Sequence, residues 1–135
     1  YGDLKKGKRE GSGKLMAVGS LIYEGEWKND KFDGFGKKYY QDGSIYEGNF
    51  RQNECLGFGM LNWGDGYFYY GEFLGGLFQG IGVVLKGKQV LASGIWDRGE
   101  LTYQRDHTGL FKKLQSRYKN EINQMDITES FLVNN

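Results

Sequence analysis

The sequence of 135 residues contains no proline, one cysteine and one histidine. The lone Cys55 excludes a disulfide within the chain and a zinc site built from several cysteines. No apolar run approaches the roughly twenty residues that a membrane-spanning helix requires, and no secretory signal is recognisable at the start. Lysine and arginine number 18 against 17 for aspartate and glutamate. We therefore expect no overall field that would attract nucleic acid.

Catalytic motifs are also lacking. Residues 11–14 (Gly-Ser-Gly-Lys) are similar to part of a phosphate-binding loop, but Lys8 stands at the first required glycine. Leu15 then follows the lysine where that loop needs serine or threonine. His107 is the only histidine, and we expect it at a helix end rather than as a base or ligand. We predict no enzyme activity, no catalytic residues, no metal site and no cofactor.

Glycine is the residue in excess, with 23 copies, and its spacing reveals an internal repeat. One set recurs at a constant step and consists of Gly2, Gly25, Gly48, Gly71 and Gly94. Aromatic residues keep the same step around it, namely Tyr23, Trp27, Tyr46, Phe50, Tyr69, Phe73 and Trp96. A period between about twenty and fifty residues is typical of an open array, in which each unit buries its apolar face against its neighbours.

Each unit predicts a β-hairpin. Residues 23–28 alternate apolar or small residues with charged ones, as in a strand with one covered face. Asn-Asp-Lys at 29–31 supplies a turn, residues 34–40 form a second strand, and Asp-Gly at 42–43 turns the chain again. We therefore predict an all-β fold, an elongated, twisted antiparallel sheet of consecutive hairpins. About nine strands spaced about 4.8 Å apart would span about 43 Å.

The chain divides into a repeat array over residues 1–101 and a helical tail or cap over residues 102–135. The repeats cover about residues 1–22, 23–45, 46–68 and 69–91, with a partial copy at 92–101. Atypical terminal repeats are the expected caps of such an array. Because the chain begins at Tyr1 inside a repeat, we expect further repeats upstream.

The repeated glycines need a physical reason, since glycine normally weakens a strand. Their regular presence indicates that bulky groups pass close to the backbone. We expect aromatic rings of adjacent strands to lie over it and to form a continuous row along the sheet. The aromatic residues of the repeat are therefore assigned to the structural core.

The segment Tyr23-x-Gly25-x-Trp27, followed by Gly34-x-Gly36, resembles a MORN repeat (membrane occupation and recognition nexus). The segments that begin at Tyr46 and Tyr69 match the same pattern. The resemblance implies a groove-shaped sheet of hairpins. It also implies a non-catalytic scaffold or interaction module that binds a partner helix or extended segment.

The family resemblance further implies a cytoplasmic protein, with junctional, ciliary and cytoskeletal assemblies as settings. Two alternatives remain open. One is a peripheral membrane or phospholipid-binding adaptor that uses the basic residues 1–22. The other is a regulatory module of a larger enzyme.

A partner should contact apolar residues that the repeat pattern does not require. Phe32 and Phe78 share one such position, and Tyr40 and Trp63 share another near the end of the second strand. Aromatic residues are common interface anchors. We predict these four as partner-binding residues, although the same side chains would also suit the core or a site under the tail.

The tail carries the apolar spacing of an amphipathic helix. Its stripe consists of Phe111, Leu114, Tyr118, Ile122 and Met125. Asp106 or Thr108 is expected to cap its start, and residues 126–129 resemble a capping box for a short second helix. We expect the helix to fold back over the last sheet edge or the groove. The alternative is that its stripe docks on a partner.

Overall fold

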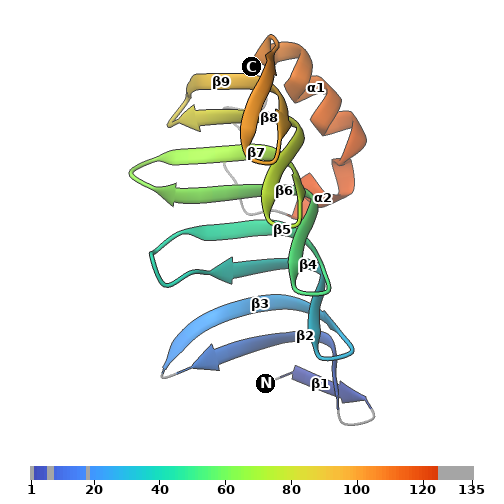
Figure 1. Cartoon of the computed structure of the whole chain (residues 1–135). Coiled ribbons are helices and arrows are strands. Elements are labelled where there is room, and N and C mark those ends of the chain that lie inside the picture. The colour runs from blue at the N-terminus through green and yellow to red at the C-terminus, as the bar shows by residue number, and fades with distance from the viewer. Residues whose placement is uncertain (1, 6–7, 18, 125–135) are drawn as a thin grey trace.

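The computed structural model describes residues 2–5, 8–17 and 19–124. Within these residues, ten strands form one antiparallel sheet in which each strand pairs with its neighbours in sequence (Figure 1). The strands are β1 (Gly2–Lys5), β2 (Lys8–Ala17), β3 (Ser20–Lys28), β4 (Lys31–Tyr39), β5 (Ile45–Arg51), β6 (Glu54–Gly64), β7 (Tyr67–Leu74), β8 (Leu77–Lys86), β9 (Gln89–Asp97) and β10 (Glu100–Gln104). Two helices follow, α1 (His107–Arg117) and α2 (Lys119–Gln124). The predicted fold is confirmed, with one strand more than expected.

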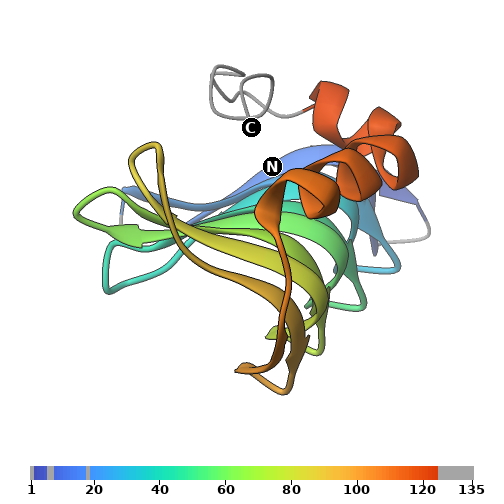
Figure 2. The ribbon, with the colours of Figure 1, turned by 90° about the horizontal axis from the view of Figure 1, so that it is seen from above.

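A row of paired glycines crosses the sheet from β1 to β9. Each glycine is the cross-strand partner of the next, in the order Gly2, Gly13, Gly25, Gly36, Gly48, Gly59, Gly71, Gly82 and Gly94. In the second, third and fourth repeats the pairing slips just after the row, at Glu26, Asn49 and Glu72. Such bulges bend a strand. The strands curve through their middles, which gives the sheet a concave and a convex face (Figure 2).

Two apolar clusters lie on opposite faces, because neighbouring residues of a strand point to opposite sides. Tyr69 belongs to the concave cluster, which consists of Tyr23, Trp27, Phe32, Tyr46, Phe50, Cys55, Tyr69, Phe73 and Trp96. Tyr70 belongs to the helix-covered cluster, which consists of Phe58, Tyr70, Ile81, Val83, Leu85, Leu110, Phe111, Leu114 and Ile122. The helices lie on the convex side of the sheet (Figure 2).

Ring contacts run the length of the concave cluster. Tyr23 stacks on Phe32 with ring centroids 3.9 Å apart, and Tyr69 stacks on Phe78 at 3.7 Å. The ring of Tyr46 contacts Phe73 of the next repeat edge to face at 5.0 Å. The predicted row of rings is therefore confirmed, and it fills the concavity of the sheet.

The turns between the two strands of a hairpin tie each repeat to the one before. The backbone N–H of Asn53 donates to the carbonyl of Phe32 at 2.9 Å, and its side-chain Oδ1 accepts from the N–H of Phe32 at 2.8 Å. Asp30 makes the same two contacts with Arg9, at 3.0 and 3.2 Å. A glycine such as Gly76 keeps the backbone bond and loses the side-chain bond. Asp30 and Asn53 thus add an inter-repeat hydrogen bond that Gly76 cannot make.

The tail begins with the predicted cap. Asp106 accepts a hydrogen bond from the N–H of Thr108 at 3.2 Å, ahead of the first turn of α1. The helix ends at Arg117, and Tyr118 adopts a non-helical backbone before α2 begins. Met125 and the predicted capping box at 126–129 lie outside the described residues.

The helix does fold back, but our expectation of where it packs was wrong. It covers the convex face over β8 and β9 instead of the last edge or the concave face. The reason lies in the sheet surface. Met60, Tyr70 and Val83 present apolar side chains there, so that the fully buried Phe111 and Leu114 find apolar partners. The concave face is already filled by its own rings.

Candidate functional site

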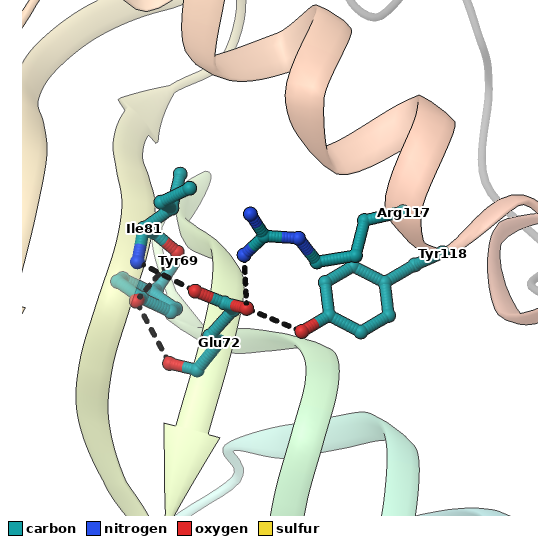
Figure 3. Close-up of polar contacts among 5 residues, drawn as sticks. All are labelled: Tyr69, Glu72, Ile81, Arg117 and Tyr118. Atoms are coloured by element: carbon teal, nitrogen blue, oxygen red, sulfur yellow. Dashed lines mark hydrogen bonds and ion pairs between the residues drawn. The ribbon is translucent and has the colours of Figure 1, made fainter.

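One carboxylate joins the tail to the sheet. Glu72 is the extra residue of the bulge in the fourth repeat, and its Oε1 accepts from the N–H of Ile81 at 2.8 Å. Its Oε2 accepts from Arg117 at 3.0 Å and from the hydroxyl of Tyr118 (Figure 3). Burial, and then the neighbouring carboxylate, raise the pKa of Tyr118 to about 12. The phenol therefore keeps its proton and donates to Glu72 at neutral pH.

The same repeat position recurs twice toward the N-terminus. In the third repeat it is Asn49, whose Nδ2 donates to Glu121 of α2 at 3.3 Å. In the second repeat it is Glu26, which accepts from the N–H of Phe35 as Glu72 does from Ile81. Glu26 and Glu72 therefore share one role, accepting a backbone N–H across the bulge, while Asn49 and Glu72 contact the tail.

The concave face offers two large exposed aromatic side chains. Tyr40 is 37% exposed and Trp63 is 41% exposed, and they occupy equivalent positions in the second and third repeats. The hydroxyl of Tyr40 lies 3.9 Å from Sγ of Cys55, and the Trp63 ring lies 6.2 Å from that of Phe78. Tyr40 therefore rests on Cys55 of the concave cluster, and Trp63 rests on the ring of Phe78 that packs against it.

The structure places the four predicted partner-binding residues on this one face. Phe32 is 8% exposed and belongs to the concave cluster, while Phe78 is half-buried and packs against that cluster. Phe78 lies beneath Trp63, whereas Phe32 stacks on Tyr23 and the residue beneath Tyr40 is Cys55. Their part in partner binding remains a prediction.

Sequence reasoning missed the lysines beside these rings. The Nζ of Lys38 lies 4.9 Å from the centroid of Tyr40, and the Nζ of Lys86 lies 4.9 Å from that of Tyr67. Tyr67 in turn stacks with Trp63 at 6.0 Å. The period of two along a strand puts Lys38 on the face of Tyr40, so the signal was present in the sequence. The aromatic surface is thus flanked by positive charge.

Cys55 lies under Tyr40 as part of the concave cluster. Burial raises the pKa of its thiol to about 11. The thiol therefore stays protonated at neutral pH, and a protonated thiol is a poor nucleophile. Its role in this surface is packing.

No helix in the described part of the chain is both long enough and apolar enough to cross a bilayer. The same residues include no group of three or more histidine, cysteine, aspartate or glutamate side chains arranged to hold a metal ion.

Comparison with protein families gives a match over most of the sheet. The model described as MORN repeat matches residues 1–17, 23–45, 46–66 and 69–85. These segments coincide with the first four hairpins. Comparison with curated proteins finds no significant match. MORN repeats are generally modules for interaction with proteins or membranes, and the repeat itself is not catalytic. The chain belongs to the MORN repeat family.

Proposed function

We propose that this protein is a non-catalytic scaffold whose concave face binds a helix or an extended segment of a partner protein. The observation that carries the proposal is the pair Tyr40 and Trp63, both exposed and both resting on residues of the packed concave face. Interface anchors are most often tyrosine, tryptophan and arginine that rest on a packed surface. We also propose a cytoplasmic setting in a large assembly such as the cytoskeleton or cilium, in line with the family.

The spacing of the two anchors defines the kind of partner. Tyr40 directly follows β4 and Trp63 lies on β6, two strands apart, which corresponds to roughly 10 Å. Residues seven apart on an α-helix are separated by about 10.5 Å. In an extended polyproline II segment, which has three residues per turn, residues three apart lie on one face and are separated by about 9.3 Å. A partner segment that runs along the array would place two apolar side chains on the two rings.

The charges beside the anchors refine this picture. Lys38 and Lys86 hold their ammonium groups against the rings of Tyr40 and Tyr67. Acidic residues next to the apolar anchors of the partner would pair with these lysines. The proposed partner segment is therefore apolar at two positions and acidic between or beside them.

A photo-crosslinking experiment tests the proposal. Benzoylphenylalanine is placed at position 63, or at the exposed position 113 of α1 as a control, and cross-linked peptides are identified by mass spectrometry in the native source. We expect position 63 to cross-link one protein segment of this composition. Changing Tyr40→Ala should then reduce the yield by about tenfold, because each anchor contributes on the order of 1.4 kcal/mol or more.

The matched control is the double variant Leu74→Ala/Leu77→Ala. These two leucines are more exposed than the anchors, at 56% and 49%, and they flank a different hairpin turn. If Tyr40→Ala/Trp63→Ala abolishes binding and Leu74→Ala/Leu77→Ala does not, the concave face is supported as the binding site. If Tyr40→Ala/Trp63→Ala has the melting temperature of the parent and still captures the partner, the assignment is wrong. Binding only to vesicles with anionic lipid would favour the membrane adaptor.

A further inference from the structure

The convex face has two unlike halves. One row of side chains crosses it from strand to strand, and each residue pairs with the next, in the order Lys14, Glu24, Lys37, Glu47, Met60, Tyr70 and Val83. The last three lie in or against the helix-covered cluster. The first four are all charged. Lys14, Glu24 and Lys37 lie on the half of the face that α1 and α2 leave open, while Glu47 at its border is buried.

An aromatic residue nevertheless stands in the open half. Phe35 is equivalent to Phe58 one repeat later, and Phe58 is fully buried with its ring 5.0 Å from that of Tyr118. Phe35 borders the helix-covered cluster but is only half-buried. It lines a surface depression together with Glu24 and Lys37. The ring therefore occupies the position that corresponds to Phe58, but no helix among the described residues covers it.

Glu26 repeats the geometry of Glu72 beside this ring. Both carboxylates accept a backbone N–H across the bulge, from Phe35 and from Ile81. The second oxygen of Glu72 binds Arg117 and Tyr118 (Figure 3). The second oxygen of Glu26 receives no hydrogen bond from the residues that the structure describes, and the side chain is exposed.

The tail points toward this position. Its helices run along the array (Figure 1), with Tyr118 over Phe58 on β6 and Glu121 bonded to Asn49 on β5. The next strands in the same direction, β4 and β3, carry Phe35 and Glu26. The open surface is thus continuous with an interface between a helix and the sheet that this protein already uses.

We propose that Phe35, Glu26, Glu24 and Lys37, here called the Phe35 patch, form a second docking site. Its occupant is a helix of a partner protein that presents an arginine and a neighbouring aromatic residue, as the end of α1 presents Arg117 and the following Tyr118 to Glu72. The arginine binds the outward oxygen of Glu26, and the aromatic ring covers Phe35. A charged-group hydrogen bond of this kind is short, strong and specific.

Two observations favour a partner over the remainder of this chain. Residues 125–135 read MDITESFLVNN and include no lysine or arginine, so they bring no cation to Glu26. The patch also has an apolar centre with a charged rim, whereas the buried stripe of α1 packs on an apolar cluster and meets the Glu72 carboxylate only at its end. An apolar centre with a polar rim is the composition of an interface that forms and dissociates.

The test uses the tail's own chemistry as a probe. A peptide that copies residues 106–124 is held helical by a link between the exposed positions 112 and 116, and its binding to the full chain is measured by fluorescence anisotropy. We expect saturable binding that weakens about tenfold on Glu26→Gln, because one charge-assisted hydrogen bond is lost. The same loss should follow Phe35→Ser in the chain or Arg117→Gln in the peptide.

The controls separate this site from its competitors. Glu54→Gln removes an exposed carboxylate elsewhere and should leave the affinity unchanged. A probe that does not bind overturns the proposal. So does binding that Glu72→Gln weakens and Glu26→Gln does not, since the peptide would then be exchanging with α1. Stronger binding by the full-length Phe131→Ser/Leu132→Ser variant would show that the chain's own end fills the patch, which also overturns it.

Discussion

The hydroxyl oxygen of Tyr69 lies 2.0 Å from the point where a Cβ atom at position 82 would stand, so only glycine fits there. Tyr46 has the same relationship to position 59, at 2.3 Å. Because Gly82 has no side chain, the ring of Tyr69 can lie directly over the backbone of the adjacent strand. The hydroxyl of Tyr69 then donates to the carbonyl of Glu72 at 2.9 Å. Tyrosine, glycine and bulge are therefore one structural unit. The same bulge aims the Glu72 carboxylate at the tail.

Replacing Gly82 tests this unit directly. Gly82→Ala drives a methyl group into the ring and hydroxyl of Tyr69, and we expect a loss of about 2–3 kcal/mol in the free energy of unfolding, as for an overpacked core. Urea denaturation measures it. Gly109→Ala is the control, because nothing lies within 4 Å of a Cβ there; in α1 it should stabilise by up to about 1 kcal/mol. A Gly82→Ala variant as stable as the parent would contradict the steric argument.

The turn residue Asn53 offers a test in which two effects oppose each other. Its φ of 73° favours glycine, while its Oδ1 holds the N–H of Phe32 at 2.8 Å. Asn53→Ala loses the bond and keeps the strained backbone, which should cost about 2 kcal/mol. Asn53→Gly loses the bond but relieves the backbone, and should cost about 1 kcal/mol or less. Thermal unfolding of the two variants shows which is the more stable. Equal stability would show that only the side-chain hydrogen bond contributes and that the backbone conformation at position 53 does not.

Most of the array could be predicted from the sequence, because its signals are local. The period, the alternation and the turn residues each concern a few neighbouring positions. The stacking of Phe32 on Tyr23 and of Phe78 on Tyr69 could not be predicted in this way, because each pair of rings meets only where the sheet bends. Nothing in a one-dimensional pattern gives that bend.

The tail's destination was missed for a different reason. The stripe of α1 is evident in the sequence, and so is the change from Glu47 to Tyr70 at one repeat position. The repeat consensus does not reveal this change, because the position is not part of it. When equivalent positions of successive repeats are aligned, the later repeats have apolar residues on the convex face where the earlier repeats have charged ones. The contact of Glu72 with Arg117 joins distant segments and had no sequence signal of its own.

The buried thiol of Cys55 gives a prediction in pH. Burial raises its pKa to about 11, and only the thiolate reacts with iodoacetamide. The rate of alkylation should therefore increase with pH around pH 11, rather than around pH 9 as for an exposed thiol. At pH 8 we expect a rate about a hundredfold below that of an exposed thiol, from the two-unit difference in pKa. Lys88→Cys in a Cys55→Ser background provides that exposed thiol. Equal rates for the two cysteines in the folded state, as expected only in denaturant, would contradict the assigned burial.

The attachment of the tail rests on apolar and polar contacts of unequal weight. Leu114 is fully buried, and Leu114→Ala should cost about 3 kcal/mol of unfolding free energy. Glu72→Gln keeps an acceptor for Ile81 but loses the ion pair with Arg117, whose side chain is 52% exposed. We expect that change to cost only about 1 kcal/mol or less, because solvent screens the pair.

Hydrogen exchange distinguishes the two contributions by location. Glu72→Gln should speed exchange about fivefold at 119–124, beyond the ion pair, and leave the first turns of α1 protected, since about 1 kcal/mol corresponds to that factor. Leu114→Ala should expose the whole of 107–124. Glu54→Gln serves as the charge-matched control and should change neither. If Glu72→Gln released α1 as fully as Leu114→Ala does, the carboxylate would be the principal anchor of the tail, and the apolar seat on the convex face would only guide it.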